Sequence, residues 1–307
     1  MSYDAKYDGL IDAQTWAFIR ETESFYPPDA IGLSTEGQRA FYDRMCKAFH
    51  AGRPPGVTVQ DTALGDIPLR QYQSQPNAKA QVLYLHGGGF VVGGLNSHDD
   101  ICAEICARTG FDVTAVAYRL SPEHPFPQDF DDALAAAQAG SKPLVLVGDS
   151  AGGNLCAALS AALETPSLGQ VLIYPSLGPP TPTASMTTHA YAPMLTAQDC
   201  VYYAQIRAAQ NPQTLDDPRF SPMRAASFAG LPPTIAISAE CDPLADDAAL
   251  YCTAIASAGG RARHIREAGL VHGYLRARHR ADRARASFAR IIHVIAALGK
   301  GDWPEAF

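Results

Sequence analysis

The chain has 307 residues, of which 47% are hydrophobic and 18% charged, a composition typical of a globular protein with a sizeable core. Its formal net charge is -7, and no long basic block interrupts the sequence. These properties argue against nucleic acid and against an anionic membrane surface as binding partners.

The N-terminal segment, MSYDAKYDGLIDAQTWAF, has early acidic residues and no uninterrupted apolar stretch. It therefore lacks the pattern of a secretory signal. No apolar run reaches the roughly 18 residues that predict a membrane-spanning helix. The seven cysteines are scattered along the chain, which argues against a disulfide framework or a zinc site. We expect a cytoplasmic protein that does not insert into membranes.

Helices are expected first, at residues 13–23 and 37–50, because apolar and polar residues mix there without strict alternation. Two short strand-like stretches follow, at 57–60 and 69–72, and a Gly-Asp turn lies between them. This arrangement predicts an antiparallel pair of strands that opens a sheet.

From residue 81 onward, short apolar runs alternate with Ala-rich stretches. Nearly continuous apolar runs are typical of strands that are buried on both faces, as in a parallel sheet covered by helices. The runs lie at residues 81–85, 113–117, 144–147, 171–174 and 234–238. Helices are expected at 131–139 and 151–163, and an amphipathic helix at 288–298. The pattern predicts an α/β fold with a mostly parallel central sheet flanked by helices.

One region breaks this rhythm. Residues 175–222 begin rich in Pro, Thr and Ser and become helical around 196–209. An insertion of this length between two strands is either a lid or a disordered linker. We favour a lid that pairs with the N-terminal helices, because it contains four large side chains that could supply apolar area: Tyr191, Met194, Tyr202 and Tyr203.

This interpretation gives a domain organisation. Residues 1–50 would form the N-terminal part of a helical cap. Residues 51–307 would form the catalytic domain, with a cap insertion at about 176–222.

A serine lies between a predicted strand and a predicted helix, in the sequence LVLVGDSAGGN. Its pentapeptide Gly148–Gly152 matches G-x-S-x-G, in which a nucleophilic serine occupies a sharp, strained turn between small residues. A helix that begins there directs free amides towards developing negative charge. Ser150 is therefore the candidate nucleophile, and the alternative is a serine that only caps a helix. The similar motif of trypsin-like proteases occurs in an all-β fold, with His and Asp before Ser.

Three glycines follow the strand predicted at 81–85, in the sequence His86-Gly87-Gly88-Gly89-Phe90. Consecutive glycines let backbone amides approach a substrate oxygen and stabilise an oxyanion. A phosphate-binding loop is the alternative, but neither glycine spacing that is typical of such loops occurs. We expect His86 to anchor the loop by hydrogen bonds rather than to titrate during a reaction.

These two motifs resemble the hormone-sensitive-lipase family of bacterial esterases, which carry H-G-G-G and G-D-S-A-G-G. Further segments of the chain also match this family: YRLSPEHPFP, LIYP, ECDPLADD and GLVHGY. The resemblance implies an α/β-hydrolase fold with a helical cap, and an enzyme that cleaves short-chain carboxylic esters without a cofactor or a metal. It also implies that the amides of Gly88, Gly89 and Ala151 form the oxyanion hole.

The order Ser, acid, His is expected for this architecture. Four of the nine histidines follow the acidic segment after residue 238: His264, His272, His279 and His293. His264 lies in a predicted strand, and His279 and His293 lie in a predicted helical region. Only His272 lies on a short loop after a strand, from which an imidazole can reach the nucleophile. It is the candidate general base.

The candidate acid, Asp242, follows the strand predicted at 234–238. Glu240, Asp246 and Asp247 are alternatives, and we expect the pair Asp246-Asp247 to face solvent at the start of a helix. The D-P-L motif of the family selects Asp242. Its role would be to bind the imidazole N–H, fix the tautomer and stabilise the cation that forms.

The sequence Ser97-His98-Asp99-Asp100 could suggest a metal site. No spacing typical of metal ligands supports this reading. We therefore interpret the segment as the start of a helix.

Acyl transfer to water through a serine ester intermediate is the expected reaction, with a small-molecule ester as partner and a homodimer left open. The same machinery could serve an amidase or N-deacetylase. A non-catalytic receptor is a third reading, because plant gibberellin receptors resemble this family but lack the catalytic histidine. The presence of Ser150, Asp242 and His272 favours the enzyme.

Overall fold

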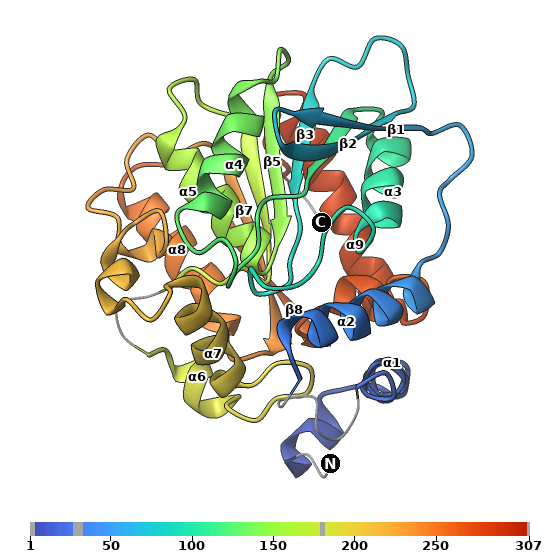
Figure 1. The fold of residues 1–307 in the computed structure, drawn as a ribbon, viewed down its shortest axis with the longest axis vertical. Coiled ribbons are helices and arrows are strands. Elements are labelled where there is room, and N and C mark those ends of the chain that lie inside the picture. Colours follow the sequence, from blue (N-terminus) through green and yellow to red (C-terminus); the bar gives the residue numbers. More distant parts are fainter. Residues whose placement is uncertain (1–3, 27–32, 179–181, 306–307) are drawn as a thin grey trace.

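The computed structural model describes residues 4–26, 33–178 and 182–305. At its centre is an eight-stranded sheet in the order β1-β2-β4-β3-β5-β6-β7-β8 (Figure 1). The strands are β1 Thr58–Leu64, β2 Ile67–Gln73, β3 Gln81–Leu85, β4 Asp112–Val116, β5 Leu144–Asp149, β6 Gly169–Ile173, β7 Thr234–Cys241 and β8 Ala262–Val271. Strand β2 is antiparallel to both neighbours, and the later pairs are parallel. The predicted α/β class is confirmed.

Helices cover both faces of the sheet (Figure 1). One face packs against α3 (Asp99–Thr109) and α9 (Asp282–Leu298), and the other packs against α4, α5 and α8. The remaining bounds are α1 Ala13–Glu23, α2 Thr35–Phe49, α4 Gln128–Gln138, α5 Ala151–Ala162, α6 Ala184–Thr188, α7 Ala197–Arg207 and α8 Ala245–Ser257. Short 3-10 helices occur at Ala5–Gly9, Pro212–Asp216, Pro222–Arg224 and Tyr274–Ala277.

The central strands β3 to β7 have two buried faces because their side chains alternate between two cores. In β3, Val82 and Tyr84 join the core that contains α3 and α9. Leu83 and Leu85 join the core beneath α4, α5 and α8. A strand that is apolar at nearly every position is therefore required, which explains why continuous apolar runs marked these strands in the sequence.

The predicted elements are confirmed with boundaries shifted by a few residues. The helix predicted at 131–139, for example, is α4, Gln128–Gln138. One assignment is wrong. His279 lies in the turn before α9 rather than in a helix, because α9 begins only at Asp282. Within the described ranges, no helix combines the length and the apolar character that crossing a membrane requires.

The N-terminal helices α1 and α2 and the inserted helices α6 and α7 lie at the same end of the sheet (Figure 1). The Gln38 amide of α2 donates to the Tyr202 hydroxyl of α7 at 3.1 Å. The Tyr7 hydroxyl and His189 Nδ1 are 3.1 Å apart, and Lys6 Nζ donates to a backbone carbonyl in α6. The two segments are thus joined by side-chain contacts.

The apolar contribution expected from the insertion is only partly present. Met194 and Tyr203 pack against the main core. Tyr191 is 81% exposed, so its expected packing role is wrong, and Tyr202 is 38% exposed. Tyr191 lies in the turn between α6 and α7 rather than in a helix, and Tyr202 lies on the solvent-facing side of α7.

Candidate active site

Ser150 stands in the turn between β5 and α5, with φ 54° and ψ -115°. This left-handed backbone is strained for a residue with a side chain. It is held by a hydrogen bond from the Ser150 amide to the Ile173 carbonyl at 2.8 Å. The turn lies at the carboxyl end of a central parallel strand, where ligands bind in open α/β sheets.

The glycines on either side of Ser150 have no room for a side chain. A Cβ at Gly148 would lie 2.4 Å from the Gly152 carbonyl oxygen. A Cβ at Gly152 would lie 1.8 Å from the Leu85 carbonyl oxygen. The close approach of α5 to strands β5 and β3 therefore requires glycine at both positions, which accounts for the motif seen in the sequence.

Asp242 and His272 follow neighbouring strands. The last residues of β7 and β8, Cys241 and Val271, pair directly after a register irregularity. Because parallel strands end at the same edge of a sheet, the next residues of the two strands lie side by side. This topology brings together two side chains that are 30 residues apart in the chain.

The three candidate residues form a continuous line of hydrogen bonds. His272 Nδ1 lies 2.7 Å from Asp242 Oδ2, and His272 Nε2 lies 2.9 Å from Ser150 Oγ. With a neutral imidazole, Nδ1–H donates to the carboxylate and Nε2 accepts from the serine hydroxyl. The Asp242 side chain is only 1% exposed, and its Oδ1 accepts the Leu244 amide at 2.8 Å. The carboxylate is thus fixed on both oxygens.

Tyr174, for which no role was predicted from the sequence, supports the His272 imidazole. It stands just after β6, and its ring centroid lies 4.8 Å from that of His272. Its φ of 34° is unusual for a bulky residue. The position of tyrosine at the end of a predicted strand, next to the nucleophile strand, was the signal in the sequence.

The glycine loop lies beside Ser150 because β3 and β5 are neighbours, with Leu85 paired to Gly148. Gly88 and Gly89 have φ values of 131° and 60°, which L side chains rarely adopt. Within the described parts of the chain, the amides of Gly88, Gly89 and Ala151 donate to no backbone or side-chain oxygen. They remain available for a substrate oxygen.

His86 anchors this loop, as expected. Its Nδ1 lies 2.8 Å from the Gly87 carbonyl, to which it can donate, and its ring stacks on Tyr118 at a centroid distance of 4.3 Å. Burial, together with the charge of His98, lowers the pKa of His86 to about 4. The imidazole is therefore neutral at physiological pH.

Asp149 joins the turn at Ser150 to the glycine loop, a role that was not predicted from the sequence although the residue directly precedes Ser150. Its Oδ1 accepts the Gly87 amide at 3.0 Å and the Tyr84 hydroxyl at 2.9 Å. His98 Nε2 lies 3.2 Å away. Burial alone would raise the pKa of Asp149, but its interactions with His98, Arg276 and Tyr84 together outweigh burial and hold the pKa below its ordinary value.

Asp247 was expected to face solvent, and this expectation is wrong. The residue is 1% exposed, and its Oδ2 accepts the Leu177 amide at 2.7 Å. Its neighbour Asp246 is less buried and accepts the Ser185 amide at 2.8 Å. The two carboxylates thus accept the backbone amides of Leu177 and Ser185, near the start of the insertion. Buried backbone amides need such acceptors.

Burial raises the pKa of Asp247 to about 7, which predicts a stability effect. Between pH 4 and 7, roughly, the folded protein retains a proton that the unfolded chain releases, so stability falls as pH rises through this window. Asp247→Asn removes this dependence. We expect the melting temperature of the variant, relative to that of the native protein, to increase by a few degrees from pH 5 to pH 8. A difference between the two melting temperatures that does not change with pH would contradict the assignment.

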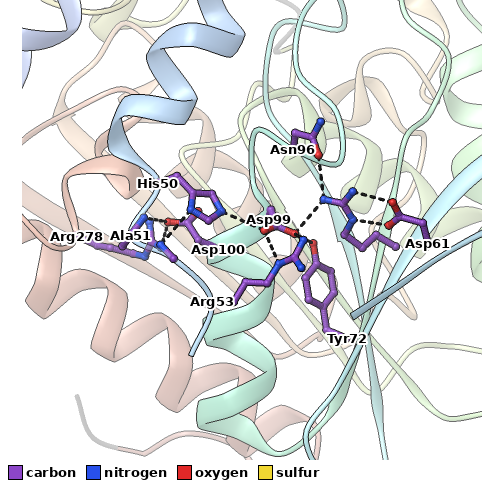
Figure 2. Close-up of polar contacts among 11 residues, drawn as sticks. His50, Ala51, Arg53, Asp61, Tyr72, Asn96, Asp99, Asp100 and Arg278 are labelled. Carbon is purple, nitrogen blue, oxygen red and sulfur yellow. Dashed lines mark hydrogen bonds and ion pairs between the residues drawn. The ribbon is translucent and has the colours of Figure 1, made fainter. Parts of the chain in front are cut away.

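The segment at 97–100 is confirmed as a helix start, since α3 begins at Asp99 with His98 as its N-cap. Asp99 binds His50, Arg53 and Tyr72 (Figure 2). It also accepts a hydrogen bond from Arg70 Nη1 at 3.0 Å. Asp100 binds the Ala51 amide and Arg278. This network ties the chain after α2 to β2, to α3 and to the turn before α9. Among the described residues, no cluster of His, Cys, Asp and Glu could hold a metal ion.

Comparisons with known proteins agree with the α/β fold. Residues 82–276 match the model of a family described as having the α/β-hydrolase fold. An ethyl acetate hydrolase from Pseudomonas putida is 36% identical over 230 residues, covering 68% of this chain and 72% of the relative. The carboxylic ester hydrolase LipN from Mycobacterium tuberculosis is 32% identical over 296 residues, covering 87% and 78%.

Solved structures are also similar. An esterase from Pyrobaculum calidifontis superposes with a TM-score of 0.85 at 28% identity, covering 94% of this chain and 99% of that one. An esterase described as a bacterial hormone-sensitive-lipase family member gives a TM-score of 0.82 at 26% identity, covering 98% and 99%. The chain therefore belongs to the hormone-sensitive-lipase family of α/β hydrolases.

Proposed function

We propose that the protein is a carboxylic ester hydrolase that cleaves short-chain acyl esters, with Ser150 as nucleophile, His272 as general base and Asp242 as its partner. The observation that carries the proposal is the line from Ser150 Oγ through His272 to Asp242, with contacts of 2.9 and 2.7 Å. Ester hydrolysis is the activity named for several relatives of this chain.

The acylation step follows from this geometry. Ser150 Oγ attacks the ester carbonyl carbon while His272 Nε2 takes the hydroxyl proton. The carbonyl oxygen becomes an oxyanion, and the amides of Gly88, Gly89 and Ala151 stabilise it. The C–O bond to the alcohol then breaks, and the alcohol oxygen receives the proton from His272. Asp242 stabilises the imidazolium while it exists.

Deacylation repeats these steps with water. His272 takes a proton from water as the water oxygen attacks the acyl carbon. The tetrahedral intermediate collapses, the bond to Ser150 Oγ breaks, and His272 returns the proton to Oγ. The carboxylic acid leaves, and the three side chains are restored to their starting states.

The receptor reading predicts a site without a working base. In this chain the imidazole is present and lies within hydrogen-bond reach of the serine hydroxyl. This distance is within the range from which a general base can accept the proton. The enzyme is therefore favoured over the receptor.

A panel of p-nitrophenyl esters and matched anilides tests the substrate class. We expect kcat/KM for the acetate and butyrate esters to exceed that for long-chain esters by on the order of tenfold or more. We expect the anilides to react more slowly than the matched esters. Equal or faster anilide cleavage would favour an amidase, and faster cleavage of long chains would refute the short-chain assignment.

We also propose that residues 1–50 and about 176–222 form a cap over the site. The contacts of Gln38 with Tyr202 and of Tyr7 with His189 support this pairing. Tyr203 supports it as well, since its ring lies against Gly89 in the glycine loop. The cap would then shape the space for the acyl and alcohol groups.

A cytoplasmic location is a further proposal. All seven cysteines are free thiols, and six of them are buried. Thiols persist in the reducing conditions of the cytoplasm, so this location is compatible with the cysteine chemistry.

A further inference from the structure

Helix α7 places two side chains, one turn apart, on the glycine loop. Tyr203 and Arg207 are spaced i, i+4 and therefore lie on one face of the helix. A Cβ at Gly89 would lie 2.5 Å from atoms of the Tyr203 ring, so the ring rests directly on this glycine. The guanidinium carbon of Arg207 lies 3.7 Å from the ring centroid of Phe90. Adjacent residues of the loop are thus covered by the same helix.

Arg207 is a fully buried cation, with a side chain that is 1% exposed. Its Nε donates to Asp129 Oδ2 at 2.6 Å, an aspartate that is equally buried. Its Nη2 is buried and donates to no acceptor in the described chain; the ring of Phe220, 4.4 Å away, and that of Phe90 face the guanidinium instead. Burial of an ion pair contributes little net stability, so stability alone does not account for this arrangement.

Arg207 also reaches the nucleophile helix. Its Nη1 donates to Asn154 Oδ1 at 3.1 Å and to the Phe220 carbonyl at 3.1 Å. The backbone N–H of Asn154 makes the helical hydrogen bond to the Ser150 carbonyl at 3.1 Å. One guanidinium therefore contacts both Phe90, at the end of the glycine loop, and Asn154, one turn after the nucleophile.

The loop depends on such packing because its backbone is strained. Phe90 has φ 65°, an uncommon value for a bulky residue that persists only where the surroundings impose it. Its carbonyl accepts the Ser121 amide at 2.9 Å, and its ring meets the Arg207 guanidinium. A change in the position of Phe90 would move the preceding amides of Gly88 and Gly89.

We propose that Arg207 is a positioning residue: from α7 it holds Phe90 and Asn154 so that the amides of the glycine loop and Ser150 keep their reactive geometry. The inserted segment then does more than cover the site, since it sets the shape of the oxyanion hole. This inference rests on the proposed esterase function and deepens it. A displacement of about 1 Å in such a site can lower the rate about 100-fold.

Arg207→Met tests the proposal. The concentration of active sites is first measured by titrating a separate sample of the enzyme to completion with a fluorophosphonate. The value of kcat then refers to folded enzyme. We expect kcat per site on p-nitrophenyl butyrate to fall by about 10- to 100-fold, with KM within about twofold, because the amides act mainly on the transition state. The inhibition constant of a trifluoromethyl ketone, which forms an oxyanion on the serine, should rise by a similar factor.

Arg207→Lys separates positioning from charge. Lysine keeps the positive charge beside Asp129 but lacks the planar fork that spans Asn154 and the Phe90 ring. We expect it to leave the rate low. The matched control is Arg219→Met, since Arg219 lies 5.4 Å from the Phe126 ring, which Arg207 also faces, but pairs with Asp217 and is 46% exposed. This control should keep native kinetics.

If Arg207→Met does not fold, Arg207→Met combined with Asp129→Asn removes both members of the buried pair, and the same kinetic result is expected. Native kcat per site and a native ketone constant in these variants would overturn the inference while the esterase function stands. Full rescue by lysine would also overturn it. A native protein that hydrolyses no ester would refute the proposed function, and the inference with it.

Discussion

Replacement of Ser150 by alanine is expected to lower kcat on p-nitrophenyl butyrate by roughly 10⁵- to 10⁶-fold. The reason is that Ser150 Oγ, 2.9 Å from His272 Nε2, is the atom that forms the acyl intermediate. Binding and oxyanion stabilisation would leave a residual rate above that of water. Steady-state kinetics with the purified variant, together with its melting temperature, measures the effect.

Ser227→Ala is a suitable control because Ser227 is exposed and its hydroxyl contacts only a nearby amide among the interactions described. It should retain the native rate. A folded Ser150→Ala variant with more than about one per cent of native activity would contradict the role of this serine.

Asp242→Asn is expected to lower kcat by about 10⁴-fold while the fold is retained. The asparagine amide can replace one carboxylate oxygen, but it offers no negative charge to the imidazolium. Its NH₂ group would also favour the imidazole tautomer with Nδ1 unprotonated, which leaves Nε2 unable to accept the Ser150 proton. The pH dependence of kcat/KM and the melting temperature check this result.

Two nearby acids serve as controls for Asp242. Glu240 accepts the Gly269 amide at 2.8 Å, and Asp246 accepts the Ser185 amide at 2.8 Å. Among the described residues, neither carboxylate forms a hydrogen bond with His272, which binds Asp242 instead. Glu240→Gln and Asp246→Asn should therefore keep most of the activity. If either variant lost activity as Asp242→Asn does, the acid would be misassigned.

The strands of the sheet, and the order of the serine, the acid and the histidine along the chain, could be predicted because they depend on local sequence. Strands buried on both faces need continuous apolar residues, as in the stretch that became β5. The turn at Ser150 needs glycine at 148 and 152 for the close approach of α5. Since the carboxyl ends of parallel strands share one edge, motifs after separate strands could be expected to converge.

Other features could not be predicted because they depend on contacts between distant segments. Asp247 lies in the first turn of α8 beside another aspartate, yet the insertion covers it and supplies the Leu177 amide. Tyr191 looks like a core residue in the sequence but is exposed. Arg207 has no motif around it, and only the packing of α7 on Phe90 reveals its place. Local sequence does not specify which segment will cover such residues.

Ser150 is expected to carry the acyl group during turnover. The direct measurement is mass spectrometry of the protein quenched with acid during hydrolysis of a p-nitrophenyl ester, followed by peptide mapping. We expect one acyl group on the peptide that contains Ser150 and none in Ser150→Ala. The fraction of protein that carries the group should increase when deacylation is slow. Rapid hydrolysis with an unmodified Ser150 peptide, or an acyl group on another residue, would contradict the account.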